Sequence, residues 1–269
     1  MHIIQEISGF LKGIFNDRKI LWELAKNDFK ARFANALLGG FWAFAQPLVT
    51  LLVFWFVFEL GFKNPPVSDV PFIVWLTPAY LAWTFFSEGL SSGTNCLMEY
   101  GYLVKKVNFH VSLIPLVKIL SSAFIHIAFI AFIFFMLIVC GIPLSIYNLQ
   151  VFYYFACTCI LLVGLNWILS AIAPFIKDVV SIVNIIIQIG FWATPIFWSP
   201  EGMSQIVQVI LHLNPMFYIC RGYRDCFVDH VWFWKRPMST IFFWCVAPLC
   251  VMFGALIFRK LRPQFADVL

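Results

Sequence analysis

Six long apolar segments divide this chain, and polar or turn-forming residues separate them. Each segment is close to the ~20 helical residues that cross a hydrocarbon core of about 30 Å. Runs this long and continuously apolar are not typical of barrel strands, which alternate in polarity over about 10 residues. The pattern predicts an all-α polytopic membrane protein with six transmembrane helices, at residues 37–62, 71–93, 113–141, 151–174, 179–198 and 240–258.

Composition supports a membrane protein and leaves little room for a soluble domain. The chain is 62% hydrophobic and 12% charged, with a mean hydropathy of +0.90. Soluble domains have about 45–50% apolar and about 25% charged residues. We expect a cytoplasmic N-terminal region at 1–36, a transmembrane domain at 37–258 and a cytoplasmic tail at 259–269. The net charge of +5 needs no nucleic-acid partner, because anionic lipids attract basic residues.

Lysine and arginine predict the orientation, since they are enriched in cytoplasmic loops. Placing both termini in the cytoplasm puts thirteen of the 18 basic residues inside. These are Lys12, Arg18, Lys19, Lys26, Lys30, Arg32, Lys105, Lys106, Lys118, Lys177, Arg259, Lys260 and Arg262. Five remain outside: Lys63, Arg221, Arg224, Lys235 and Arg236.

Two cytoplasmic segments have more structure than a simple connection requires. Residues 17–33 form a basic amphipathic stretch, which is typical of a helix in the membrane interface. This helix either serves only to anchor the orientation of the chain or also forms a docking surface. The polar loop 99–112 is either a solvated connection or a partner contact, with a short helix before Pro115. The apolar face of the first segment contains Ile20, Leu21, Leu24, Phe29 and Phe33.

The outer connection 199–239 is long, and long loops without their own structure are uncommon. Helical spacing of Ile206, Val209, Ile210 and Leu213, followed by Asn214-Pro215, predicts two short helices that re-enter the outer leaflet. We expect a gate there with Met216, Phe217 and Tyr218 at a pore mouth. Arg221, Arg224 and Asp225 would face water or each other, although Arg224 and Asp225, as neighbours on a helix, should each bond elsewhere. The sequence alone leaves open whether Cys220 and Cys226 form a disulfide.

The chain has few sequence features that indicate catalysis or the binding of a cofactor. No G-x-x-x-x-G-K-[ST] motif for phosphate binding is present, and the eight cysteines form no metal pattern. Gly89–Gly93 matches G-x-S-x-G inside a span, where small residues favour close helix packing. Glu59, Glu88 and Lys118 lie near span ends and are expected to reach an interface. His126 is expected to pack and hydrogen-bond to a neighbouring helix.

Aromatic residues make up 19% of the chain. Many fit interfacial belts, but Phe44, Phe191 and Trp192 fall deeper. Aromatic faces stack on the C–H faces of sugar rings, so these three are candidates for a glycan conduit. Alternatively, these three side chains face lipid.

Four stretches in order carry a resemblance to a known family. They are residues 24–33 with Leu38-Gly39 and 42–48, residues 102–109 with Pro115, Thr194-Pro195-Ile196, and Asn214-Pro215-Met216 with Tyr223-Arg224-Asp225. Together they resemble the permease subunit of bacterial ABC-type polysaccharide exporters of the type-2 class, which export O-antigen, capsule or teichoic acid.

The resemblance implies a homodimer that works with two copies of a separate ATP-binding subunit. ATP and Mg²⁺ would bind that subunit, and this chain would hold no cofactor or metal and have no catalytic residue. The substrate would be a polysaccharide on an undecaprenyl-diphosphate carrier, exported across the bacterial inner membrane. Alternatives are an ABC permease for drugs or small hydrophobic molecules, and a membrane enzyme acting on lipid-linked sugars.

Residue roles follow from this interpretation. We expect contact with the ATP-binding subunit at Glu99, Tyr102, Lys105, Lys106 and Phe109. The carrier diphosphate should meet Lys26, Lys30 and Arg32, because basic side chains bind phosphate oxygens at the cytoplasmic interface. The outer gate should contain Ile206, Ile210, Met216, Phe217, Tyr218 and Arg224.

Overall fold

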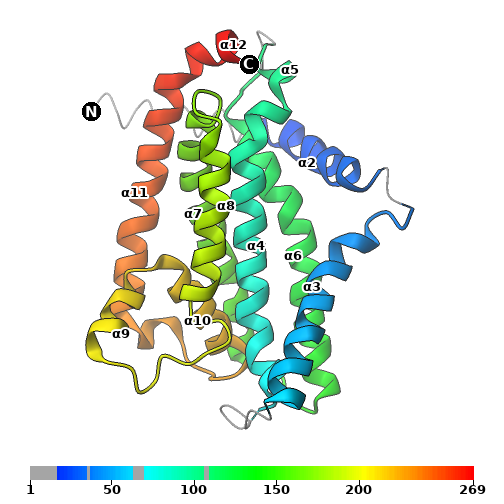
Figure 1. Cartoon of the computed structure of the whole chain (residues 1–269), viewed down its shortest axis with the longest axis vertical. Helices are drawn as coiled ribbons and strands as arrows, with labels where there is room; N and C mark the ends of the chain where they lie inside the picture. The colour runs from blue at the N-terminus through cyan, green and yellow to red at the C-terminus, as the bar shows by residue number, and fades with distance from the viewer. Residues whose placement is uncertain (1–16, 35–36, 63–69, 106–108) are drawn as a thin grey trace.

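The computed structural model describes residues 17–34, 37–62, 70–105 and 109–269. Over these residues the chain is 81% helical and has no strand, which confirms the all-α prediction. The long helices form one bundle (Figure 1). Residues 1–16 of the expected N-terminal region lie outside the described residues.

A helix covers most of each of the six predicted spans. The first is α3 (Phe41–Phe54), which continues as a π-helix over Trp55–Gly61. The others are α4 (Phe72–Glu99), α6 (Leu113–Val139), α7 (Gln150–Ile172), α8 (Asp178–Ala193) and α11 (Pro237–Leu261). The shorter helices are α2 (Arg18–Phe33), α5 (Gly101–Val104), α9 (Gln205–His212), α10 (Pro215–Phe227) and α12 (Phe265–Val268).

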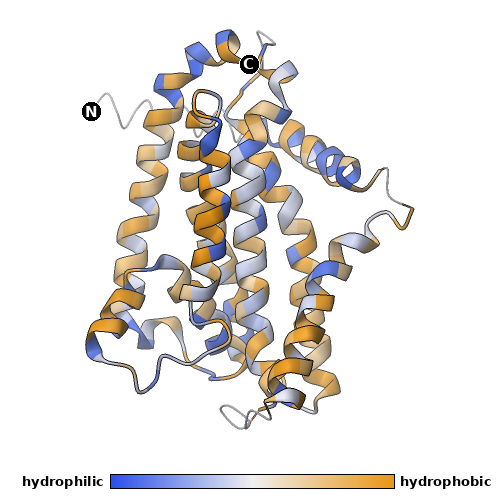
Figure 2. Cartoon of the chain, viewed as in Figure 1, coloured by the Kyte–Doolittle hydropathy of each residue, from blue (hydrophilic) through white to orange (hydrophobic). Residues whose placement is uncertain are grey.

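Four helical stretches among the described residues are long and apolar enough to cross a membrane, so the chain is a multi-pass membrane protein. They are Phe41–Gly61, Leu113–Val139, Ile146–Ile172 and Pro237–Val268. Helix α4 has 28 residues but is paler than α11 in the hydropathy view (Figure 2). Helix α8 has 16 residues, which extend about 24 Å at 1.5 Å per residue.

The predicted end of the fifth span, at Trp198, is too late. Helix α8 stops at Ala193, and Thr194 adopts an extended conformation. Thr194 precedes Pro195, and a residue before proline is disfavoured in the helical region. The chain turns at this point toward α9 and α10.

Helix α4 packs against α6, α7, α8 and α10 and forms the centre of the bundle. Its glycines permit close approach to α7, because a Cβ at Gly93 would lie 2.1 Å from Nδ2 of Asn166. The Asn166 side chain donates a hydrogen bond of 2.9 Å to the Gly89 carbonyl. The small residues of the G-x-S-x-G stretch therefore serve helix packing, as predicted.

Helices α7 and α11 approach each other in the same way. A Cβ on Gly164 would lie 2.6 Å from the backbone carbon of Cys250, and one on Gly254 would lie 2.5 Å from the Gly164 carbonyl oxygen. Two glycines therefore let the two helix backbones touch along the side of the bundle.

The two ends of the bundle carry different elements. Helix α2 lies obliquely beside α6, and α5, α12 and the C-terminus lie at that same end (Figure 1). Helices α9 and α10 lie at the opposite end (Figure 1). The segments expected to meet a cytoplasmic partner are thus separated from the expected outer element by the length of the bundle.

Candidate functional site

A buried ion pair fastens α2 to the bundle. Asp28 of α2 is 4% exposed, and its Oδ1 accepts hydrogen bonds from Lys118 Nζ at 2.6 Å and from Tyr100 Oη at 2.7 Å. Lys118 also lies 2.5 Å from Oε2 of Glu99. Burial raises the pKa of Asp28, but the hydrogen bonds, led by that from Lys118, outweigh burial and hold the pKa below its usual value.

This network bears on two expectations. Lys118 is 4% exposed and pairs with Asp28 and Glu99 within the bundle, so its side chain does not lie on the protein surface. In the segment 17–33 the buried residues are Ala25 and Asp28, neither of which belongs to the predicted apolar face. A carboxylate on the packed face had been missed, and the lone lysine inside the third span was the signal that could have indicated it.

The expected carrier-lipid residues separate into two groups. Lys30 is exposed, and Lys26 forms a surface pair of 3.1 Å with Glu23. Arg32 points inward, where its Nη1 lies 2.5 Å from Oε1 of Glu88 and its Nε lies 3.1 Å from Oδ2 of Asp28. Of the three, Arg32 lines a cavity in the bundle.

The expected coupling residues lie at the α2 end of the bundle. Tyr102 on α5 is 61% exposed, and Lys105 directly after α5 is exposed. Phe109 is half-buried against an apolar cluster that includes Phe265 of α12, and the side chain of Glu99 pairs with Lys118. Lys106 lies outside the described residues. The coupling role of these residues stays a prediction.

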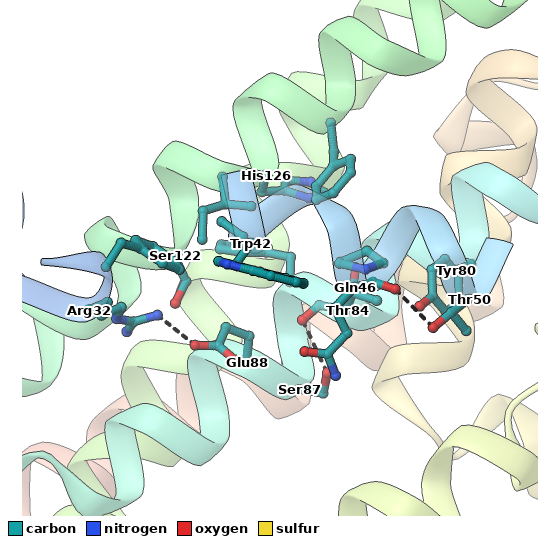
Figure 3. A pocket seen from close by; sticks show the side chains of 16 residues that line it. Arg32, Trp42, Gln46, Thr50, Tyr80, Thr84, Ser87, Glu88, Ser122 and His126 are labelled. Carbon is teal, nitrogen blue, oxygen red and sulfur yellow. Dashed lines mark hydrogen bonds and ion pairs between the residues drawn. The ribbon is translucent and has the colours of Figure 1, made fainter. Parts of the chain in front are cut away.

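The cavity lies between α3, α4 and α6 and has a volume of about 390 Å³. Figure 3 shows its side chains, with the Arg32–Glu88 pair at one end, Thr50 and Tyr80 at the other, and Trp42 and His126 between them. Ser122 and His126 are buried members of its wall. The cavity thus combines one ion pair with several uncharged polar groups inside an apolar bundle.

His126 packs as expected. Its Nε2 lies 2.7 Å from the hydroxyl of Tyr223 on α10, and its ring stacks on Phe85 with a centroid distance of 4.5 Å. The imidazole therefore joins α6 to α4 and α10, and the predicted hydrogen bond to a neighbouring helix is confirmed.

The three candidate channel aromatics lie in different surroundings. Phe44 is half-buried and contacts Phe129, with ring centroids 5.4 Å apart. Phe191 is half-buried and stacks on Phe54, with centroids 6.2 Å apart. Trp192 is 58% exposed on α8. A role in a conduit stays a prediction for all three.

Polar side chains continue from the cavity onto the surface of α4 and α8. Glu88, Asn184 and Gln188 are exposed, and Ser91 donates a hydrogen bond of 2.8 Å to Oδ1 of Asn184. Ionisable and polar side chains are costly against lipid and normally face a bundle interior or a water-filled space. This surface is therefore unsuited to hydrocarbon, and we call it the α4–α8 polar face.

The outer element consists of two helices broken at Asn214-Pro215, as predicted. Asn214 caps α10 by accepting a hydrogen bond of 2.9 Å from the Met216 amide, and Pro215 occupies the first turn, where its missing donor costs nothing. Ile206 and Ile210 are 73% and 60% exposed on α9.

Residues at the start of α10 do not lie at an open mouth. Met216, Phe217 and Tyr218 are 2%, 4% and 4% exposed, because α10 packs its length against α4, α7 and α11. A gating role stays a prediction for these three. Cys220 and Cys226 lie on the same helix as free thiols, so they are not bridged to each other.

Arg224 and Asp225 bond elsewhere, as expected, but neither faces water. Arg224 is 5% exposed and donates hydrogen bonds to the carbonyls of Trp75 at 3.2 Å, Pro195 at 2.7 Å and Ile196. Its guanidinium lies 3.5 Å from the centroid of the Trp75 ring. Asp225 is fully buried and accepts two hydrogen bonds, of 2.6 and 2.7 Å, from Arg236. Arg224 thus joins the end of α8 to α4.

Comparison with known proteins finds relatives over nearly the full length of the chain. The chain is 25% identical over 263 residues to an O-antigen export system permease protein RfbA of Klebsiella pneumoniae, covering 93% of this chain and 95% of the relative. A protein of the same name from Myxococcus xanthus is 21% identical, with 96% and 98% covered. The ABC-2 type transporter family matches residues 20–228. The chain therefore belongs to the ABC-2 type transporter family.

Proposed function

We propose that this chain is the membrane-spanning subunit of an ATP-driven exporter of a lipid-linked polysaccharide. The observation that carries the proposal is family membership together with near full-length similarity to permeases named for O-antigen export. The glycan would be built on an undecaprenyl-diphosphate carrier and leave the cytoplasmic side of the bacterial inner membrane. The chain itself is a transport permease rather than an enzyme.

Six spans with both termini cytoplasmic give the arrangement that best accommodates this role. The distribution of basic residues supports the orientation, and α2, α5 and α12 share one end of the bundle. Helices α9 and α10 would then re-enter the membrane from the outer side and close the export path. Helices α4 and α8 would be the two spans that are not apolar or long enough to stand alone in lipid.

A homodimer would cover the α4–α8 polar face. Glu88, Asn184 and Gln188 are exposed there, and a second copy would enclose them in a shared water-filled conduit. Two copies of an ATP-binding subunit would dock at the α2 end against Tyr102 and Lys105, which are exposed on and after α5. ATP and Mg²⁺ would be bound by those subunits.

Arg32 is the residue best placed to meet the carrier diphosphate. Its side chain reaches the cavity from the α2 end of the bundle, and its Nη2 has no hydrogen-bond partner in the described part of the chain. Arginine binds phosphate oxygens with parallel hydrogen bonds. Lys26 and Lys30 are nearer the surface and would add attraction for anionic lipid head groups.

Deletion and complementation in the bacterium of origin test this function. Loss of the chain should remove the polysaccharide from the cell surface while glycan attached to undecaprenyl diphosphate accumulates inside, and wild-type complementation should restore surface display. Unchanged display in the deletion strain would contradict the proposal. Increased sensitivity to hydrophobic drugs with normal display would favour a permease for small molecules.

A further inference from the structure

Two buried polar groups in the cavity wall have no hydrogen-bond partner among the residues that the structure describes. Nδ1 of His126 and Oγ of Ser122 lack hydrogen bonds, although each residue is 2% exposed. Both lie on α6, four residues apart, and therefore on one helix face, and both line the cavity between α3, α4 and α6. Buried polar groups are nearly always hydrogen-bonded in proteins. A hydrogen-bonding ligand at this wall would supply the missing partners of these two side chains once they turn toward the cavity.

The remaining walls favour an uncharged, ring-shaped ligand. The lining combines uncharged polar side chains from α3 and α4, such as Gln46 and Thr84, with the rings of Trp42, Phe85 and Phe129. Aromatic faces combined with neutral hydrogen-bonding groups match a pyranose, which has apolar C–H faces and a rim of hydroxyls. The volume of about 390 Å³ falls within the range of about 300–1,000 Å³ seen for small-molecule pockets.

Charge is confined to one end of the cavity. Arg32 lies there between Asp28 and Glu88, at 3.1 and 2.5 Å, so its charge is already shared by two carboxylates. An anion deep in the cavity would meet no further cation among the lining residues. At the Arg32 end, however, Nη2 is buried without a partner among the described residues, and a phosphate oxygen that reached it would satisfy this donor.

We infer that this cavity is a subsite for the sugar bonded directly to the carrier diphosphate. Ser122 and His126 would hydrogen-bond the sugar, the aromatic rings would cover its faces, and the diphosphate would lie at Arg32. The inference rests on the proposed function, because it takes the substrate to be a glycan on a diphosphate lipid. The subsite would let each protomer bind the first sugar before the rest of the glycan enters the conduit.

The test compares two probes on the full-length permease with its ATP-binding subunit in lipid nanodiscs. One probe is undecaprenyl diphosphate, and the other carries a single N-acetylglucosamine. The wild type should bind the sugar-bearing probe about ten-fold more tightly, as expected for two additional neutral hydrogen bonds. Ser122→Ala should reduce this preference several-fold and leave the affinity for undecaprenyl diphosphate unchanged.

Two further variants keep the test decisive. Ala43→Leu fills the cavity from α3 and should abolish the sugar preference without altering α6. Ser170→Ala removes a buried hydroxyl that does not line the cavity, and it should keep the wild-type preference. Equal binding of the two probes by the wild type, or an unchanged preference in both cavity variants, would overturn the subsite. Failure of both probes to bind the wild type would instead contradict the proposed carrier lipid, and with it the subsite.

Discussion

Nζ of Lys118 lies 2.6 Å from Oδ1 of Asp28, and this buried pair joins the peripheral helix α2 to the membrane helix α6. Tyr100, at the end of α4, donates to the same carboxylate oxygen. Three elements that are distant in sequence therefore meet at one carboxylate. Since Arg32 is one turn further along α2 and contacts Asp28, the position of the cavity entrance depends on this anchor.

Breaking the anchor should destabilise the protein. Removing one partner of a buried ion pair costs about 3–5 kcal/mol when the other charge is left uncompensated, and the loss here should stay below that range because Lys118 keeps Glu99 and Asp28 keeps Arg32. We expect Asp28→Asn and Lys118→Met each to lower the thermal transition of the purified protein, and the double variant to be more stable than Lys118→Met. Fluorescence-detected size-exclusion after heating measures this. Lys26→Gln, which removes an exposed pair, should shift the transition little, because such pairs contribute about 0–1 kcal/mol. Equal transitions in all variants would contradict the anchor.

The anchor should also have a defined pH dependence. The pKa of Asp28 is lowered in the folded protein, so its stabilising contribution is fully present above its unfolded pKa of about 3.9 and is lost as the pH falls through the lower folded value. The stability difference between wild type and Asp28→Asn should stay constant from pH 8 to pH 5. A difference that already disappears in that range would show that the carboxylate is not held ionised as the geometry requires.

Close packing of α7 on α11 predicts a glycine-specific effect. Gly164→Ala would place a Cβ 2.6 Å from the Cys250 backbone, so the helices must separate, and overpacking of this kind costs about 1–3 kcal/mol. Gly40→Ala is the matched control, because nothing lies within 4 Å of a Cβ there. Thermal unfolding of both variants should show a loss for Gly164→Ala alone, and a similar loss at Gly40 would refute the explanation.

Arg224 should not be replaceable by lysine. Its planar guanidinium serves three carbonyl groups and lies against Trp75, whereas lysine is a compact point charge without a fixed fork. Arg224→Lys should loosen the end of α8 and increase proteolysis at residues 194–204, while Arg221→Lys changes it little. Limited proteolysis in nanodiscs measures the difference. Wild-type cleavage in Arg224→Lys would mean that the guanidinium geometry is not needed.

Reversal of charge at the α5 end should separate ATP hydrolysis from export. Lys105 is exposed directly after α5, so Lys105→Glu should disturb the contact with the ATP-binding subunit and reduce export several-fold, while the chain still inserts. Lys235→Glu, exposed at the α9–α10 end, is the matched control. Normal export by Lys105→Glu in an intact complex would exclude Lys105 from coupling.

The sequence predicted the helices better than their contacts. Uninterrupted apolar runs are enough to place α3, α4, α6, α7 and α11, because length and hydropathy are local properties. The early end of α8 required the tertiary setting of Thr194-Pro195, where Arg224 binds the last carbonyls. A local pattern shows that a proline is present, but not that an arginine 29 residues later will donate a hydrogen bond to its carbonyl.

The site shows the same limit more clearly. Arg32 was predicted as a carrier ligand from its position before the first span, but its pairing with Glu88, 56 residues later, depends on how α2 packs against α6. Ser122 has no distinguishing pattern in a long apolar run, and neither the cavity nor its unpartnered hydroxyl can be read from periodicity. Sequence reasoning therefore missed the long-range contacts of Arg32 and the role of Ser122 in the cavity wall.

ATP-dependent movement of a lipid-linked glycan in proteoliposomes tests the account most directly. Vesicles containing this chain and its ATP-binding subunit would carry a fluorescent undecaprenyl-diphosphate oligosaccharide in the leaflet where ATP is supplied. Its transfer would be followed by loss of access to a membrane-impermeant quencher in that leaflet. We predict transfer that requires both subunits and hydrolysable ATP and that falls strongly in Asp28→Asn. Sustained ATP hydrolysis by the assembled complex with no glycan transfer would contradict the proposed function.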